Sequence, residues 1–230
     1  MHALVLAAGD GKRLRPLTND RPKPMILLNG RPLLEYVLDE LPREVSDIIL
    51  IVGYKSEIIK KYFGDSYKGR PVAYIEQKKR LGTAHAVHLA RPLIHEKFIL
   101  LNGDDIGDKR SFEEGMRYDY CLFVSEHEDP SRFGVVEINE DGTLKNIVEK
   151  PEVPATNTVS TGTMVLSPEI FDIPLVKHPN GEHYIVDSLA GIKKEHPIQV
   201  IRQQSWITVT YPEDIPKTEE LLKKKAKMVH

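Results

Sequence analysis

Residues 2–18 read HALVLAAGDGKRLRPLT, and this stretch decides the fold class. Residues 3–8 are aliphatic without interruption and end at Gly9, a pattern typical of a parallel strand that is covered on both faces. Gly9 and Gly11 then allow backbone N–H groups to approach an anion closely. We therefore expect a buried strand that carries an anion-binding loop at its carboxyl end.

Strand-like runs alternate with helical patterns through the first half of the chain. Strands are expected over residues 48–53, 72–77 and 97–105, and helices over residues 31–41, 56–63 and 82–90. This alternation predicts an α/β fold with a doubly wound, mostly parallel central sheet and helices on both faces. Such sheets bind ligands at the carboxyl ends of their strands, where the loop at Gly9 and the pair Asp104-Asp105 both fall.

The pattern changes from residue 119 onward, where hairpin-like strands would make the sheet mixed. We expect strands over 120–126, 133–139, 144–150 and 161–167, a helix over 182–195, one or two strands within 197–209 and a closing helix over 213–228. No internal repeat or low-complexity linker is visible. Residues 1–230 are therefore interpreted as a single domain, with a nucleotide-binding half over 1–118 and a second half over 119–230.

Composition excludes several classes of protein. Lys plus Arg total 32 against 34 for Asp plus Glu, a net charge of 32 − 34 = −2, which removes the general electrostatic case for nucleic acid. No run approaches the ~20 apolar residues of a membrane span, and no signal-peptide pattern opens the chain. The single Cys excludes a disulfide framework and a Cys-rich zinc site. We expect a cytoplasmic globular protein with neither nucleic-acid nor membrane partners.

Other familiar sites fail when they are tested against the residues. A dinucleotide fingerprint needs a glycine where Leu14 stands, and a P-loop needs Ser or Thr where Arg13 follows Lys12. No G-x-S-x-G elbow is present, which leaves a Ser-His-Asp hydrolase without support. We expect the remaining metal or thiol candidates to be packing or surface residues: His85, His88, Cys121, His178 and His183.

The longer motif GDGKRLRPLT (9–18), followed by RPKPM (21–25), closely resembles the signature of sugar-1-phosphate nucleotidylyltransferases. These enzymes make NDP-sugars from an NTP and a sugar 1-phosphate. The resemblance continues in order along nearly the whole chain through QKKRLGTAHA (77–86), LNGDD (101–105), FGVVE (133–137), VEKP (148–151), TGTMVLSPEIFD (161–172) and GEHYIVDSL (181–189). It covers the catalytic domain and implies the nucleotide-diphospho-sugar transferase (glycosyltransferase-A-like) fold, with residues 119–230 as the sugar-phosphate-binding half.

The resemblance implies a catalytic set of Arg13, Lys23 and Asp104. Nucleotidyl transfer needs little acid–base chemistry, because the attacking sugar phosphate is already ionised near pH 7. Catalysis then depends on positioning and charge neutralisation. Arg13 and Lys23 would contact the polyphosphate, and Asp104 would bind Mg²⁺ that clamps the NTP. Asp105 is the weaker metal candidate.

Two further sets of residues are implied to contact the substrates. The nucleotide set is Leu6, Ala8, Gly9, Gly11, Lys12, Gln77, Gly82 and Thr83, and the sugar-phosphate set is Gly134, Glu149, Lys150, Ser160 and Gly162. Gln77 offers a donor and an acceptor to a pyrimidine edge. Thr83 would cap the helix that follows. Glu149 would accept hydrogen bonds from sugar hydroxyls, and Lys150 would hold the sugar 1-phosphate.

One position departs from the family pattern. Relatives usually carry an Asp two residues after the equivalent of Trp206, and that Asp completes the metal site; here Thr208 stands there. The metal would rest on Asp104, phosphates and water, or on a recruited Glu213 or Asp214, or activity would be diminished.

We therefore expect Mg²⁺-dependent transfer of a nucleoside monophosphate to a hexose 1-phosphate, with dTTP or UTP and glucose 1-phosphate favoured. One alternative is a cytidylyltransferase for a phosphorylated alcohol, whose terminal pattern resembles WITVTYPED (206–214). Another is a non-catalytic, regulatory binder of nucleotide sugars, which the missing carboxylate at residue 208 favours. The oligomeric state is left open.

Overall fold

The computed structural model describes residues 1–228 and places the aliphatic strands in one ten-stranded mixed sheet. Four parallel strands run in the order β7-β1-β4-β6 at its centre: β1 (His2–Ala7), β4 (Asp47–Val52), β6 (Arg70–Glu76) and β7 (Phe98–Asn102). The doubly wound arrangement expected for the first half is confirmed here.

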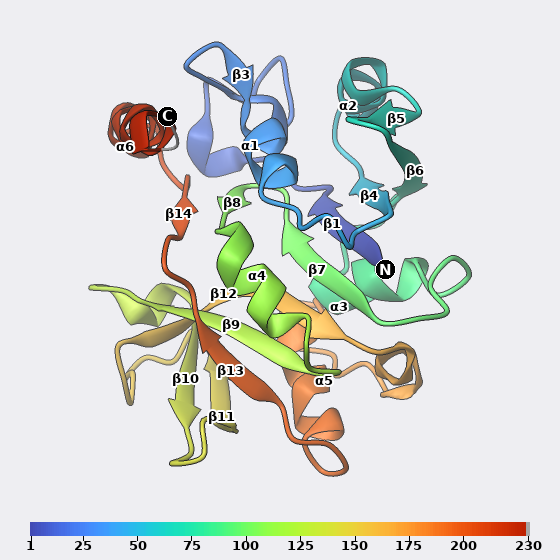
Figure 1. The fold of residues 1–230 in the computed structure, drawn as a ribbon, viewed down its shortest axis with the longest axis vertical. Helices are drawn as coiled ribbons and strands as arrows, with labels where there is room; N and C mark the ends of the chain where they lie inside the picture. Colours follow the sequence, from blue (N-terminus) through green and yellow to red (C-terminus); the bar gives the residue numbers. More distant parts are fainter. Residues whose placement is uncertain (229–230) are drawn as a thin grey trace.

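The second half of the chain extends this sheet with mostly antiparallel neighbours. Beside β7 lies β12 (Thr158–Leu166), which pairs in turn with β9 (Cys121–Glu126) and β10 (Gly134–Ile138). The outer strands of this half are β11 (Leu144–Glu149) beside β10 and β13 (Gln199–Arg202) parallel to β9, while β5 (Ser66–Tyr67) of the first half borders β6 at the other edge. In Figure 1, β10, β11 and β13 lie at the end of the molecule opposite the blue β3 hairpin, α2 and β5.

Helices cover both faces of the sheet because strand side chains alternate between two cores. Ala3 and Val5 of β1 join one core, whereas Leu4 joins the other. The first core receives α1 (Leu33–Asp39), α2 (Ser56–Phe63), α4 (Lys109–Gly115) and α6 (Asp214–Met228); the second receives α3 (Thr83–Leu89) and α5 (Ile185–Ile192). Single 3₁₀ turns are η1 (Lys12–Leu14), η2 (Lys23–Met25), η3 (Pro130–Arg132) and η4 (Pro168–Asp172).

Two small two-stranded sheets join distant segments beside the main sheet. The hairpin of β2 (Leu27–Leu28) and β3 (Arg31–Pro32) receives α6, where the Asn29 backbone N–H donates to a Glu219 carboxylate oxygen at 2.7 Å (Figure 1). Strand β8 (Asp105–Ile106) pairs with β14 (Ile207–Thr208). The last part of the chain therefore returns to the carboxyl end of β7.

Some expected boundaries were wrong for local physical reasons. Helix α5 begins at Ile185 rather than residue 182, because the backbone of His183 bonds instead to the loop before α3. Strand β12 begins three residues earlier than expected. By contrast, the one or two strands expected within 197–209 are present as β13 and β14. Helix α4 was not anticipated; the Asp108 side chain caps it by accepting from Ser111 N–H at 2.9 Å.

Cys121, His178 and His183 make contacts that are consistent with structural roles. Cys121 is buried in β9, and burial raises the pKa of its thiol well above the usual range. His178 contacts Asp187 at 2.7 Å, and the His183 ring contacts the Val176 carbonyl at 2.9 Å. Across residues 1–228, no helix has both the length and the apolar character that a membrane crossing requires.

Candidate active site

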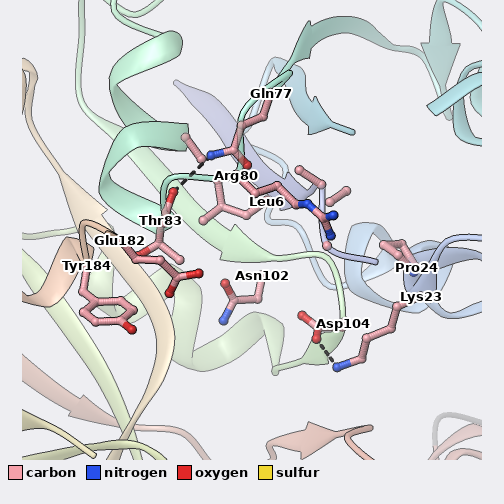
Figure 2. A pocket seen from close by; sticks show the side chains of 15 residues that line it. Leu6, Lys23, Pro24, Gln77, Arg80, Thr83, Asn102, Asp104, Glu182 and Tyr184 are labelled. Atoms are coloured by element: carbon pink, nitrogen blue, oxygen red, sulfur yellow. Dashed lines mark hydrogen bonds and ion pairs between the residues drawn. The ribbon is translucent and has the colours of Figure 1, made fainter. Parts of the chain in front are cut away.

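Two neighbouring cavities open where β1 and β7 end, at the carboxyl edge of the parallel strands. One of about 260 Å³ is lined by the loop after β1, and one of about 310 Å³ extends toward β10–β12. We call them the loop-side and sheet-side cavities. They share five lining residues: Leu6, Thr83, Asn102, Glu182 and Tyr184. Figure 2 shows these side chains around the loop-side cavity. Two ligands bound in the two cavities would therefore be adjacent.

The loop after β1 is folded around a buried threonine. Thr18 is fully buried, and its hydroxyl donates to the Gly11 carbonyl at 2.8 Å. Gly11 has φ +58°, and a Cβ there would lie 2.9 Å from the Thr18 methyl group and 3.0 Å from Lys23 Cβ. Glycine is needed at residue 11 for both conformation and space. Around Gly9, by contrast, there is open space toward the cavity.

Lys23 and Asp104 meet at the loop-side cavity although they lie 81 residues apart in the chain. Their ammonium and carboxylate groups form an ion pair, and both side chains are mostly buried. Figure 2 shows the pair beside Asn102. The structure therefore places one cation and one carboxylate of the expected catalytic set in contact.

Arg13 lies apart from that pair. Its guanidinium sits over the Tyr211 ring, 5.8 Å from the ring centroid, and it lines neither cavity. Lys12 and Gly11 also lie outside the two linings. The arginine that does line the loop-side cavity, together with Lys23, is Arg80, which the sequence reasoning missed.

Arg80 is held by the loop after β1. Its guanidinium forms an ion pair with Asp10 at 2.7 Å, and Lys12 approaches the same carboxylate at 3.8 Å. Partial burial acts to raise the pKa of Asp10, but the hydrogen bond and charge of Arg80 together with Lys12 outweigh it and lower the pKa. Asp10 therefore gathers two cations at the cavity rim.

A tightly bonded loop forms the far wall of the loop-side cavity. The Gln77 amide is buried and donates to the Gly82 carbonyl at 3.1 Å, which uses one of the two groups that Gln77 was expected to offer to a base. Gly82 has φ +94°, and a Cβ there would lie 2.3 Å from the His183 carbonyl oxygen. Thr83 does not cap α3; its hydroxyl accepts from Ile185 N–H at 2.9 Å. The loop before α3 is thus joined to the start of α5.

The sheet-side cavity contains all five residues of the expected sugar-phosphate set: Gly134, Glu149, Lys150, Ser160 and Gly162. Lys150 pairs with Glu149 at 3.2 Å and lies over the Tyr184 ring, with its Nζ 5.5 Å from the centroid. The Ser160 hydroxyl accepts from Gly162 N–H at 3.1 Å. Lys150 thus contacts both the Glu149 carboxylate and the face of the Tyr184 ring.

A bulge in β12 sets the junction between the cavities. The register between β12 and β9 shifts between Ser160 and Met164, and Gly162 adopts φ +76°. A Cβ on Gly162 would lie only 2.1 Å from the Asn102 side-chain nitrogen. Only glycine at residue 162 leaves room for the Asn102 amide at the end of β7.

Asp105 is a buried acid beside the Lys23–Asp104 pair. Its side chain lines the sheet-side cavity, and Asn102 donates to its Oδ2 at 2.9 Å. Burial, and then the negative charge of Asp104, raises the pKa of Asp105 to about 7. Lys23 opposes that rise in pKa most strongly, followed by the side chains of Thr208 and Asn102.

The donors at this point fit a hard divalent cation. Mg²⁺ prefers one or two carboxylates together with phosphate oxygens and water, and Asp104 and Asp105 supply carboxylates at the junction of the cavities. Asp214 is unavailable for recruitment, because it accepts from the Thr210 and Tyr211 N–H groups at 2.7 Å and so holds the start of α6. Within residues 1–228 no group of three or more His, Cys, Asp or Glu side chains is placed to hold a metal ion.

Sequence reasoning did not assign several lining residues to the site. Asn102, Glu182 and Tyr184 line both cavities, and they lie within the family-like motifs LNGDD (101–105) and GEHYIVDSL (181–189), but none was singled out by type or spacing. The basic run KKR over 78–80 was the one available indication of Arg80. Glu182 and Tyr184 fell inside a stretch interpreted as helix, which concealed their place in a loop.

Comparison with known proteins identifies the family. Residues 2–226 match the family model described as Nucleotidyl transferase. The UTP–glucose-1-phosphate uridylyltransferase AglF of Haloferax volcanii is 37% identical over 234 residues, covering 96% of each chain. The bifunctional protein GlmU of Methanocaldococcus jannaschii is 35% identical over 225 residues, covering 96% of this chain and 54% of that protein. The chain thus spans nearly all of AglF but about half of GlmU.

Solved structures of similar fold agree with this family assignment. A UDP-glucose pyrophosphorylase complexed with UDP-glucose superposes with a TM-score of 0.86 at 25% identity, covering 97% of this chain and 98% of that one. A putative glucose-1-phosphate thymidylyltransferase from Bacillus anthracis gives a TM-score of 0.85 at 22% identity, covering 96% and 95% of the two chains, and shares the fold. The family model and these likenesses extend over almost every residue from β1 to α6. The chain therefore belongs to the nucleotidyl transferase family.

Proposed function

We propose that this chain transfers a uridylyl or thymidylyl group from UTP or dTTP to glucose 1-phosphate and releases pyrophosphate, with Mg²⁺ as cofactor. The relative AglF, similar over 96% of both chains, is named for the reaction of UTP with glucose 1-phosphate. The observation that carries the proposal is the junction of the two cavities at Asn102, with Asp104 on one side and Asp105 on the other.

The two cavities divide the substrates between the halves of the domain. The loop-side cavity is lined mainly by residues of 1–118 and would hold the NTP, while the sheet-side cavity is lined mainly by residues of 119–230 and would hold the sugar phosphate. Glu182 and Tyr184 of the second half close the loop-side cavity. In this arrangement the sugar phosphate enters beside the α-phosphate rather than at the far end of the triphosphate.

The reaction is a single displacement at the α-phosphorus. An oxygen of the sugar 1-phosphate forms the new P–O bond, the bond to the β-phosphate breaks, and pyrophosphate leaves with the electron pair. The attacking phosphate is already ionised, so the enzyme has to overcome repulsion between two anions rather than remove a proton. Lys23 and Arg80, which line the loop-side cavity, would offset the triphosphate charge.

Arg13 is also proposed to bind the triphosphate, although its guanidinium lies outside both cavities. Its guanidinium lies over Tyr211, outside both linings. The side chain is exposed and belongs to the loop after β1, and it would have to turn from Tyr211 toward the loop-side cavity to bind a polyphosphate. A guanidinium makes fork-like hydrogen bonds to phosphate oxygens.

The metal site would be formed by Asp104 with phosphate oxygens and water. When bound, Mg²⁺ would neutralise phosphate charge and fix the triphosphate geometry. Asp104 contacts Lys23 and both line the loop-side cavity, which supports a role for the two groups at one metal–triphosphate complex. On the sugar side, Lys150 would hold the 1-phosphate and Glu149 would accept from sugar hydroxyls.

The test is a matrix of donors and acceptors. The purified chain with Mg²⁺ is incubated with each of UTP, dTTP, CTP, ATP and GTP and with a panel of sugar 1-phosphates and alcohol phosphates, and pyrophosphate release is measured. We expect turnover with UTP or dTTP and glucose 1-phosphate. Turnover only with CTP and an alcohol phosphate would establish the cytidylyltransferase instead. Tight NDP-sugar binding with no pyrophosphate release would establish a regulatory binder.

A further inference from the structure

Asp105 has an unused carboxylate oxygen in the interior of the protein. The residue is 9% exposed, and its Oδ1 has no hydrogen-bond partner. Asn102 donates to the other oxygen, Oδ2. Buried polar atoms are almost always satisfied, so an orphaned buried oxygen calls for an explanation, and an unfilled ion site is one.

Thr208 faces Asp105 directly across the β8–β14 ladder. Ile207 pairs with Ile106 and Thr208 pairs with Asp105 in antiparallel register. Side chains of directly opposed residues lie on the same face, with Cβ atoms about 5 Å apart. A carboxylate carried by residue 105 and one carried by residue 208 would therefore reach the same region of the site.

The surroundings of Asp105 provide a reason for a cation there. Asp104 is the adjacent residue, so two carboxylates stand at the junction of the cavities, and Lys23 already pairs with Asp104. Oxygens from Asp104 and Asp105, with the amide of Asn102 close by, are the hard donors that Mg²⁺ and Mn²⁺ take. A divalent ion would give the orphaned oxygen a partner and relieve the repulsion between the acids.

We propose that Asp105 is the second carboxylate ligand of the divalent cation bound by Asp104, taking the place that position 208 leaves to a neutral threonine. The inference rests on the proposed function, because it concerns the metal of the same site. Both carboxylate ligands would then come from the adjacent residues Asp104 and Asp105 after β7, and Thr208 would face Asp105 from the opposite strand.

The test measures metal binding without turnover. Wild type, Asp105→Asn, Thr208→Asp and the double variant Asp105→Asn/Thr208→Asp are titrated with Mn²⁺ alone, and again with Mn²⁺ and α,β-methylene-UTP, while free Mn²⁺ is read from its electron paramagnetic resonance signal. We expect Asp105→Asn to weaken Mn²⁺ binding at least tenfold. The double variant should return to within threefold of wild type, because the carboxylate is restored from the opposite strand.

A matched control separates ligation from general charge. Asp172→Asn removes one negative charge from an exposed residue that pairs with Arg91 and lines neither cavity, and it should change Mn²⁺ affinity less than twofold. Circular dichroism verifies that each variant is folded. Should Asp105→Asn fail to fold, Thr208→Asp alone gives an independent result: it adds a carboxylate opposite Asp105 and should tighten Mn²⁺ binding at least threefold.

Three results would overturn the proposal: unchanged Mn²⁺ affinity in Asp105→Asn, a double variant no better than Asp105→Asn, or no Mn²⁺ binding by wild type in either titration. The titration with Mn²⁺ alone needs neither nucleotide binding nor catalysis. If Asp105→Asn loses Mn²⁺ binding but the wild-type chain turns over no NTP, Asp105 is a metal ligand and the proposed function is wrong. If the wild-type chain turns over normally but Asp105→Asn binds Mn²⁺ with unchanged affinity, the proposed function holds and Asp105 is not a ligand.

Discussion

Lys23 and Asp104 form an ion pair that connects the 3₁₀ turn η2 to the end of β7. Both side chains are mostly removed from solvent, and each neutralises the charge of the other. In the proposed reaction, a metal–triphosphate complex would give the lysine phosphate oxygens and the carboxylate a cation in exchange. Groups already held near the reacting phosphates would lower the reorganisation that the reaction needs.

Replacing Asp104 by Asn should reduce kcat at least about 100-fold, because a neutral amide cannot hold the cation that clamps the triphosphate. Pyrophosphate release at saturating Mg²⁺ measures the loss, and circular dichroism should show an intact fold. Asp172→Asn is the control. The Asp172 carboxylate is exposed, forms an ion pair with Arg91 at 2.7 Å, and lines neither cavity. A variant Asp104→Asn that keeps more than half of kcat would remove Asp104 from the metal role.

Arg13→Ala should lower kcat/KM for the NTP roughly 100-fold if the guanidinium leaves Tyr211 to bind the polyphosphate. Arg132→Ala provides a matched control, because Arg132 also lies over the Tyr211 ring, 4.8 Å from its centroid, but has no proposed phosphate contact. The control should stay within threefold of wild type. Equal losses in the two variants would mean that stacking on Tyr211, rather than phosphate binding, is what Arg13 contributes.

Gly162→Ala should raise KM for the sugar 1-phosphate at least tenfold, because the new Cβ would lie 2.1 Å from the Asn102 amide and displace it. Gly181→Ala is the control for backbone strain alone: it has φ +83° and open space around its Cβ position. Both variants should lose about 1–2 kcal/mol of unfolding free energy. Steady-state kinetics should show the KM change only in the first, and a similar KM change in both would reject the role of Asn102.

Most of the fold could be predicted from the sequence, because buried parallel strands leave uninterrupted aliphatic runs and the helices between them leave a periodic stripe. The convergence of Asp104 with the loop after β1 was expected from the rule that parallel strand ends meet at one edge, whereas the place of Lys23 was implied only by the family resemblance, because Lys23 lies in η2 well after the end of β1. The contact between Gly162 and Asn102 could not be foreseen, since it depends on a bulge that shifts the register of β12. Arg80 and the loop containing Glu182 were hidden for a similar reason: neither position shows a periodicity that places its side chain in space.

Asp39 should stabilise the fold at neutral pH, and this contribution should be lost in acid. Partial burial acts to raise the pKa of Asp39, but bonds from Lys68, Arg31 and Tyr67 lower it below the usual value. A carboxyl with a lowered folded-state pKa contributes stability above pH 3.8, and that contribution is lost as pH falls through the lowered pKa. Asp39→Asn should therefore cost about 1–2 kcal/mol at pH 7, and the difference from wild type should shrink below pH 3. Urea unfolding at both pH values measures it; a constant difference would contradict the assignment.

The central claim is that an NTP and a sugar phosphate lie side by side across the junction at Asn102 and react in one in-line step. The stereochemistry at the α-phosphorus tests this most directly. With one diastereomer of UTPαS, or of dTTPαS if dTTP is the donor, and glucose 1-phosphate, a single displacement inverts the configuration at phosphorus in the NDP-sugar product. We predict inversion. Retention would require a nucleotidyl group first carried by the enzyme and would contradict the account.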